Sequence, residues 1–136
     1  MSATERVIGG DEVRVNQAGN AQVTLRLPWY RSLAPSTVED IAVSIDGHTI
    51  PRNELTVEIN GIESELDAIA DRWQETWFVQ DRAIVRFPTP GDLNGAVNTT
   101  LSITLRIPYI LTGPDSALKR STSETRKLSV VREEQP

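Results

Sequence analysis

Two stretches of alternating apolar and polar residues, each ending at a proline, constrain the fold of this chain most. In residues 21–27 the apolar side chains fall at every second position, and residues 101–107 repeat the pattern. Successive side chains of a β-strand point to opposite faces, so a period of two predicts strands with one buried face. Proline has no N–H for a ladder hydrogen bond, and we expect regular pairing to stop at Pro28 and Pro108. Aromatic residues follow directly in both cases.

Turn signals separate further candidate strands. Asp46-Gly47 and Asn60-Gly61 each lie between two short apolar-polar runs. Such dipeptides are typical of two-residue hairpin turns, because both residues must accept positive φ. The other candidate strands are residues 13–15, 41–45, 55–59, 83–87 and 123–131. Seven to nine short strands with turns between them predict an all-β protein, an antiparallel β-sandwich.

One short helix is expected among the strands. Ser64 and Asp67 have the spacing of a capping box, in which the serine side chain satisfies free amide donors of the first turn. Apolar residues then follow at helical spacing from Leu66 onward. Because residues 76–79 look strand-like again, we expect the helix to span about residues 66–73.

The length of 136 residues favours a single domain. A chain of this size buries roughly two-thirds of its unfolded surface, which is enough for a core without disulfides. The turn-rich start predicts a flexible N-terminal segment over residues 1–12. One β-sandwich domain over residues 13–131 and a polar tail over residues 132–136 would follow.

Composition excludes several classes of function. The chain has no cysteine, so it cannot form a disulfide framework, a thiolate metal site or a cysteine nucleophile. Its net charge of −5 argues against nucleic-acid binding, which requires a basic face. The sequence has neither a run of ~20 apolar residues nor the apolar segment of a signal peptide, and we expect a soluble cytoplasmic protein.

Candidate catalytic residues are few. His48, the one histidine, follows a predicted turn and has no second histidine to share a zinc or iron site, so we interpret it as a solvated hairpin residue. Four carboxylates lie close together in the sequence, and two of them could form an acid–base pair: Glu63, Glu65, Asp67 and Asp71. Helix capping and a solvated helix face explain them more simply. We predict no catalytic, cofactor-binding or metal-ligating residue in this chain.

The aromatic residues are more informative. Five of the seven fall in two places, directly after the first proline and within residues 73–78. Tryptophan and tyrosine are favoured at protein interfaces because they bury a large area at low entropic cost. For Trp77 and Phe78 the core is the better interpretation. For residues 29–31 the sequence alone leaves the core and an interface equally open.

Several segments together form a distinctive pattern. They are Arg26-Leu27-Pro28-Trp29-Tyr30-Arg31-Ser32-Leu33, Glu39-Asp40-Ile41, Asp46-Gly47, Asn60-Gly61, Trp73, Trp77-Phe78-Val79 and Leu105-Arg106-Ile107-Pro108-Tyr109. This pattern resembles the small (β) subunit of bacterial C-glycoside deglycosidases, over about residues 12–131. The run from Arg26 to Leu33 is the most specific part of the resemblance, whereas the glycine turns alone would be weak.

The resemblance implies an accessory role in a lyase complex of carbohydrate metabolism. Proteins of this family pair with a larger α subunit that resembles sugar-phosphate isomerases, a barrel with a divalent metal such as manganese. The complex cleaves the carbon–carbon bond between sugar and aglycone in 3-oxo-glucosyl C-glycosides, such as flavonoid C-glucosides. The metal ligands and the catalytic base belong to the α subunit, so the resemblance implies neither a catalytic residue nor a cofactor in this chain.

The same resemblance makes the loop after Pro28 the predicted contact with the α subunit. The interface residues we expect are Trp29, Tyr30, Arg31, Leu33 and Tyr109. Two alternatives stay open. A stand-alone carbohydrate-binding module would use Trp29 and Tyr30 as a stacking platform, and a self-contained hydrolase would use the acidic residues between 63 and 71. The complex is expected to be a heteromer of αβ units.

Overall fold

The computed structural model describes the backbone of residues 6–29, 31–113 and 116–132, and the side chains of residues 6–29, 31–107 and 119–132. In chain order the strands are β1 (Glu12–Val15), β2 (Asn20–Leu25), β3 (Val38–Ile45), β4 (His48–Thr49), β5 (Thr56–Ile59), β6 (Ile62–Glu65), β7 (Ala83–Pro88), β8 (Ala96–Gly113) and β9 (Ser116–Arg132). The predicted all-β class is confirmed.

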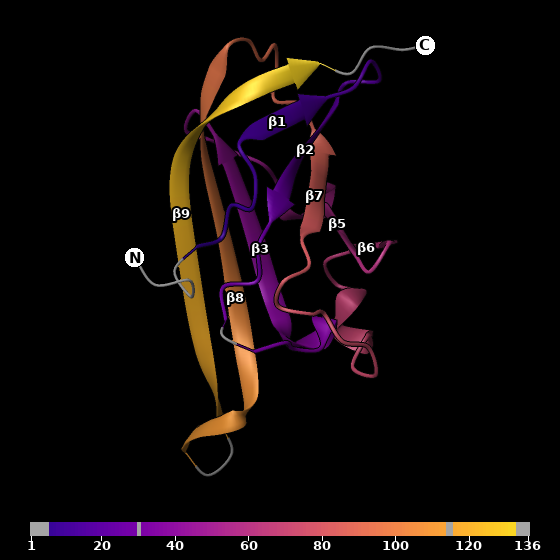
Figure 1. Cartoon of the computed structure of the whole chain (residues 1–136), viewed down its shortest axis with the longest axis vertical. Helices are drawn as coiled ribbons and strands as arrows, with labels where there is room; N and C mark the ends of the chain where they lie inside the picture. Colours follow the sequence, from indigo (N-terminus) through magenta and orange to yellow (C-terminus); the bar gives the residue numbers. More distant parts are fainter. Residues whose placement is uncertain (1–5, 30, 114–115, 133–136) are drawn as a thin grey trace.

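All nine strands join one sheet in the order β4-β3-β8-β9-β1-β2-β7-β5-β6. Figure 1 shows that this sheet curls into an open half-barrel, with the long strands β3, β8 and β9 on one side and the shorter strands on the other. The two separate sheets of the predicted sandwich are therefore not seen. The reason is β1, which pairs with β2 on one edge and with β9 on the other and so joins the two halves.

The pairing of β1 with β9 also corrects the expectation of a fully antiparallel sheet. Val13 lies opposite Val130 in a parallel ladder, while every other pair of neighbouring strands is antiparallel. Parallel neighbours need a crossover connection, and here that connection is nearly the whole chain between β1 and β9.

The core lies inside the curl and is built by alternation along the strands. In β2 the buried residues are Ala21, Val23 and Leu25, and their neighbours on the other face are partly exposed. The same pattern runs along β7 and β8. It places an apolar face of each strand against the others, which is the arrangement that a period of two predicts.

Part of the segment that the sequence predicts to be flexible lies in this core. Val7 and Ile8 are buried, and the backbone around them pairs with the end of β2 through hydrogen bonds from Gly9 N to Thr24 O (2.9 Å) and from Arg26 N to Val7 O (2.6 Å). The remaining boundaries of the predicted domain stay predictions.

The short helix predicted over about residues 66–73 is not seen beyond the single 3₁₀ turn η4 (Ile69–Asp71). The other helical turns in the described part of the chain are also 3₁₀: η2 (Pro35–Thr37) and η3 (Arg52–Glu54). Ser64 does not cap a helix, because it lies in β6 opposite Val57. The single turn of η4 ends at Arg72, whose side chain is bonded to the neighbouring hairpin instead. No helix in the described residues is long and apolar enough to cross a membrane.

Both predicted hairpin turns are confirmed. Asp46 (φ 49°) and Gly47 (φ 82°) connect β3 to β4, while Asn60 (φ 59°) and Gly61 (φ 79°) connect β5 to β6. The predicted stops at proline are confirmed only once. β2 ends before Pro28, but β8 continues past residue 108 to residue 113.

The continuation of β8 past its proline has a local explanation. The ladder between β3 and β8 extends only to Leu105, so within the described residues no strand pairs with this edge of β8 at the proline. On the other edge the register with β9 shifts between Ile107 and Leu111. A proline is tolerated on an unpaired edge or at such an irregularity because no ladder hydrogen bond is lost there.

Candidate functional site

The exposed apolar surface of the described residues is concentrated in one short stretch. Ile62, Trp73 and Phe78 are 52%, 67% and 49% exposed, and they are the large apolar side chains that the described part of the chain leaves exposed. All three fall within residues 62–78. Aromatic side chains that stay exposed in an isolated chain are typical of sites that bind another molecule. We call residues 72–81 the aromatic loop.

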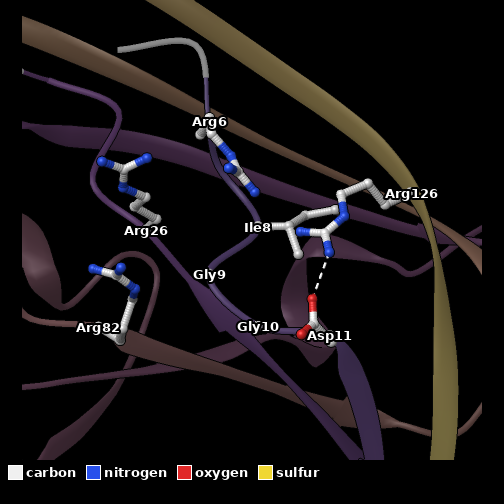
Figure 2. A pocket seen from close by; sticks show the side chains of 8 residues that line it. All are labelled: Arg6, Ile8, Gly9, Gly10, Asp11, Arg26, Arg82 and Arg126. Carbon is white, nitrogen blue, oxygen red and sulfur yellow. Dashed lines mark hydrogen bonds and ion pairs between the residues drawn. The ribbon is translucent and has the colours of Figure 1, made fainter. Parts of the chain in front are cut away.

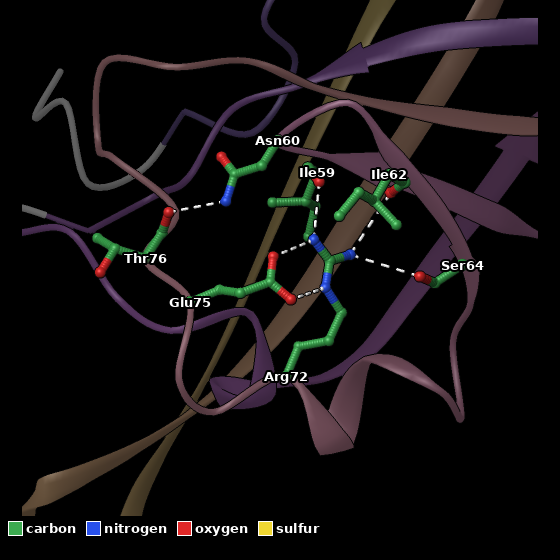
Figure 3. Close-up of polar contacts among 7 residues, drawn as sticks. All are labelled: Ile59, Asn60, Ile62, Ser64, Arg72, Glu75 and Thr76. Carbon is green, nitrogen blue, oxygen red and sulfur yellow. Dashed lines mark hydrogen bonds and ion pairs between the residues drawn. The ribbon is translucent and has the colours of Figure 1, made fainter.

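Arg72 fixes the start of the aromatic loop to the β5–β6 hairpin (Figure 3). Its Nη2 atom donates to the carbonyl oxygen of Ile59 at 2.8 Å, and its Nη1 atom lies 3.4 Å from both the carbonyl oxygen of Ile62 and the Oγ atom of Ser64. The guanidinium group also forms a bidentate pair with Glu75, with distances of 2.5 and 2.6 Å. One side chain thus holds the hairpin and the loop together.

The pair between Arg72 and Glu75 changes the ionisation of both groups. The hydrogen bonds from Arg72 lower the pKa of the Glu75 carboxyl below its ordinary value of 4.5, and the same bonds raise the pKa of the Arg72 guanidinium. The side chain of Arg72 is only 10% exposed and that of Glu75 is 34% exposed. Charge-assisted bidentate bonds of this kind are short and fix the relative orientation of the two side chains, so the pair stabilises the conformation of the loop.

Further hydrogen bonds order the rest of the aromatic loop. Asn60 of the hairpin turn donates from Nδ2 to the carbonyl oxygen of Thr76 at 2.8 Å (Figure 3). The indole N–H of Trp77 donates to the carbonyl oxygen of Asp81 at 3.0 Å, and Asp81 N donates to Phe78 O at 2.9 Å. A surface that is held in place before binding loses little conformational entropy when a partner docks.

The structure joins the two groups of aromatic residues that lie far apart in the sequence. Leu33 and Trp77 form an isolated antiparallel bridge, with Leu33 N donating to Trp77 O at 3.1 Å and Trp77 N donating to Leu33 O at 2.7 Å. Val79 N donates to the Oγ atom of Ser32 at 2.9 Å. The loop after Pro28 therefore does find backbone partners, although it has left the main ladder.

The predicted interface residues divide between the core and the surface. Trp29 and Leu33 are each only 6% exposed, and the guanidinium carbon of Arg120 lies 5.7 Å from the centroid of the Trp29 ring. Arg31 is exposed. Tyr30 and the side chain of Tyr109 lie outside the described residues. A subunit contact at this loop stays a prediction, but Trp29 is not free to serve as a stacking platform.

Trp73 and Phe78 are the exposed residues that sequence reasoning missed. The core position of Trp77 is confirmed at 1% exposure, whereas the core position predicted for Phe78 is wrong. A signal was present in the sequence. Residues 76–79 look like a strand, so side chains 77 and 78 should point to opposite faces and only one of the two can be buried.

The acidic residues of the hydrolase alternative lie on the surface and in separate ion pairs. Glu63 pairs with Arg86 at 3.1 Å, and Asp67 pairs with Arg52 at 2.6 Å. The hydrogen bonds that Arg52 donates to Asp67 and, to a smaller extent, to Asp40 raise the pKa of Arg52. All four carboxylates of this group are exposed to solvent. Nothing here shields one carboxyl from water, as a general acid requires.

His48 is exposed in the short strand β4, as expected for a solvated hairpin residue. Among the residues whose placement is described, no group of three or more histidine, aspartate or glutamate side chains could hold a metal ion. What this chain offers chemically is an ordered surface with exposed aromatic side chains.

Comparison with known proteins gives this surface a context. A family model described as the C-glycoside deglycosidase beta subunit matches residues 9–109. The chain belongs to this family. The resemblance seen in the sequence is thereby confirmed, and the matched region includes the aromatic loop and the loop after Pro28.

Individual members of the deglycosidase beta subunit family match over most of their length. The 3'-dehydrocarminate deglycosidase beta subunit of a Microbacterium species is 36% identical over 106 residues, which cover 78% of this chain and 80% of that protein. The C-glycoside deglycosidase beta subunit of Microbacterium trichothecenolyticum is 31% identical over 127 residues, with 93% and 96% covered. One from Arthrobacter globiformis is 30% identical over 130 residues, with 94% and 98% covered.

Proposed function

We propose that this chain is the accessory β subunit of a heteromeric C-glycoside deglycosidase and that it supports a separate catalytic α subunit. Membership of the deglycosidase beta subunit family carries the proposal, because a beta subunit implies a partner chain. The side chains described above agree with an accessory role, since they offer an ordered binding surface and no arrangement of acid, base and nucleophile.

The reaction of the complex is the cleavage of the carbon–carbon bond between sugar and aglycone in 3-oxo-glucosyl C-glycosides. One relative is named for 3'-dehydrocarminate and the others for C-glycosides in general. Flavonoid C-glucosides are the substrate class that we propose for this complex. The α subunit would be a barrel resembling sugar-phosphate isomerases and would hold a divalent metal, manganese in our proposal.

The aromatic loop is the contact with the α subunit. Trp73 and Phe78 are exposed and belong to residue classes that are enriched at interfaces. The hydrogen bonds of Arg72 to Ile59 and Glu75, which we call the Arg72 clamp, hold their loop in position. Arg31, exposed on the adjoining loop, extends the same surface because Ser32 and Leu33 are bonded to residues 77 and 79. A pre-ordered aromatic patch with a charged rim is the usual form of a subunit interface.

Reconstitution tests the proposed function. The chain, the α subunit and their mixture are each incubated with a flavonoid 3-oxo-C-glucoside and manganese, and release of the aglycone is measured. We expect no turnover by the chain alone and a higher rate for the mixture than for the α subunit alone. Turnover by this chain in the absence of the α subunit would contradict the accessory role, and so would a mixture no faster than the α subunit.

A further inference from the structure

A small hollow elsewhere on the molecule is lined by four arginines. Arg6, Arg26, Arg82 and Arg126 surround a cavity of about 170 Å³, together with Asp11 and the backbone of the segment that begins at Arg6. Figure 2 shows the four side chains grouped around that segment. They come from four parts of the chain: the N-terminal segment, the residue after β2, the residue before β7, and β9.

The carboxylates at this arginine pocket do not balance its positive charge. Asp11 pairs with Arg126 at 2.6 Å, and Glu124 lies 4.0 Å from the same arginine. Glu124 also accepts hydrogen bonds from the backbone N–H groups of Val7 and Ile8 through Oε1. Among the described residues, the lining of the pocket therefore holds four arginines and one carboxylate, with Glu124 within reach of Arg126 alone. This excess stands out in a chain whose net charge is −5.

The guanidinium group of Arg26 has an N–H donor without a hydrogen-bond partner among the described residues. Its Nε atom is buried and has no hydrogen-bond partner, and the described residues place no carboxylate in an ion pair with it. A buried donor on a charged group is costly to leave unbonded, so such an atom calls for an explanation. Because this atom has almost no surface open to solvent, a ligand oxygen in the pocket would bond to the other nitrogen atoms of the Arg26 guanidinium group, for which no hydrogen bond is found in the described residues. Arg82 is also incompletely engaged, since its described hydrogen bond goes to the carbonyl oxygen of Gln80.

Gly9 lets one of the arginines lie close to the backbone. A Cβ atom at Gly9 would come within 2.6 Å of the Cδ atom and 2.9 Å of the Nε atom of Arg82. The absence of a side chain at this position is therefore what allows Arg82 to lie against the segment. The sequence pair Gly9-Gly10, which looks like a flexible lead-in, forms one wall of the pocket.

We propose that the arginine pocket is a binding site for a small oxyanion, a carboxylate or phosphate group. Guanidinium groups match the geometry of both anions through paired N–H donors. The volume is well below the roughly 300–1,000 Å³ of pockets for drug-sized ligands, which suits a single anionic group and not a whole glycoside. The anion is either a free small molecule or an acidic side chain of a partner protein, and the chemistry of recognition is the same.

Calorimetric titration of the full chain with inorganic phosphate tests this site, with sodium chloride at equal ionic strength as the reference. We expect saturable binding of phosphate, and binding weaker by at least about tenfold in Arg26→Gln and in Arg82→Gln, as expected for the loss of a charge-assisted hydrogen bond. Arg106→Gln is the matched control, because Arg106 is exposed on β8 and does not line the pocket. It should bind like the wild type.

Two results would overturn the proposal: no saturable heat beyond the chloride reference, or phosphate binding by both pocket variants that equals that of the Arg106 control. Gly9→Ala provides a variant that keeps all four arginines. The added Cβ forces the Arg82 side chain to move and lies 3.1 Å from the Cγ2 atom of Thr24, so we expect weaker phosphate binding and at most a small decrease in the melting temperature.

The source of the anion is settled in a second arm of the experiment. If the pocket takes an acidic side chain of the α subunit, phosphate and the α subunit compete, and added phosphate weakens association of the wild type but not of Arg26→Gln. If the pocket takes a free anion, phosphate binds with the same affinity in the presence of the α subunit. Phosphate binding to the chain alone does not depend on the proposed function.

Discussion

At the scale of single residues, the side chain of Arg72 has the largest described set of contacts around the candidate interface. Its guanidinium group reaches the carbonyl oxygens of Ile59 and Ile62, the hydroxyl of Ser64 and both carboxylate oxygens of Glu75. Because these partners belong to the hairpin and to the aromatic loop, a change in the charge of Glu75 alters how firmly the two are connected.

The Arg72–Glu75 pair should make stability depend on pH in a defined direction. The pKa of Glu75 is lowered in the folded chain, so the pair stabilises the fold at pH values above the ordinary value of 4.5, and this contribution is lost as the pH falls through the lowered value. Urea unfolding at about pH 7 and about pH 3 measures the loss. We expect Glu75→Gln to lose less stability than the wild type between these two values.

Glu63→Gln is a suitable control for this pH experiment, since that carboxylate pairs with Arg86 and no pKa shift of Glu75 is expected from its removal. If the Glu75→Gln and wild-type chains lose the same free energy of unfolding on acidification, the Arg72–Glu75 pair makes no contribution to the pH dependence.

Two tryptophans with opposite exposure allow a direct test of the core assignment. Trp29 is 6% exposed, so Trp29→Ala should lower the free energy of unfolding of the isolated chain by about 3–5 kcal/mol, the usual cost of removing a buried aromatic side chain. Trp73 is 67% exposed, and Trp73→Ala should stay within about 0.5 kcal/mol of the wild type. Denaturant unfolding of both variants measures these changes. Equal decreases in the free energy of unfolding would contradict the core position of Trp29 and the surface position of Trp73.

At the scale of elements, the structure follows the sequence where the determining chemistry is local. Asp46-Gly47 and Asn60-Gly61 predict their hairpins correctly because each turn depends on two adjacent residues that accept positive φ. The helix expected over residues 66–73 fails because a distant contact decides its end. The 3₁₀ turn ends at Arg72, whose side chain forms hydrogen bonds with the β5–β6 hairpin. The spacing of apolar residues in the sequence cannot predict that contact.

The two hairpin turns also provide a matched pair of variants. Gly47 and Gly61 have similar positive φ angles, and a Cβ atom at either would meet nothing within 4 Å. Gly47→Ala and Gly61→Ala should therefore each lower the free energy of unfolding by about 1–2 kcal/mol, the cost of a left-handed conformation for an L-residue. Only the β5–β6 turn is connected to the aromatic loop, through Asn60 and Arg72.

Because of that connection, we expect Gly61→Ala to weaken association with the α subunit and Gly47→Ala to leave it unchanged. Thermal melts of the free chains and binding measurements on both variants provide the comparison. A Gly61→Ala chain that melts earlier yet binds normally would separate the hairpin from the interface and contradict the role given to the Arg72 clamp.

At the scale of the whole molecule, the shape of the sheet depends on contacts that no local pattern contains. Alternation predicts that β2, β7 and β8 each bury one face, and they do. It does not say which strands are neighbours. The parallel pairing of β1 with β9 joins positions more than a hundred residues apart and turns an expected sandwich into one curled sheet.

The candidate interface shows the same limit. The sequence draws attention to both groups of aromatic residues, and the structure brings them together through the Leu33–Trp77 bridge. The packing around that bridge determines which of the aromatic rings in these two groups are exposed. Trp29 and Trp77 face the core, so Trp73 and Phe78 remain on the surface. The sequence therefore singles out both groups of aromatic residues, but contacts between distant parts of the chain determine which of their rings lie on the surface.

The affinity of the chain for its α subunit tests the central claim most directly. The double variant Trp73→Ala with Phe78→Ala is compared with the wild type by calorimetry, and the free chains are compared by thermal melts. We predict an unchanged melting temperature and an association weaker by at least about 2 kcal/mol, the threshold for an interface hot spot. Wild-type affinity in a folded double variant would contradict the assignment of the aromatic loop as the subunit contact.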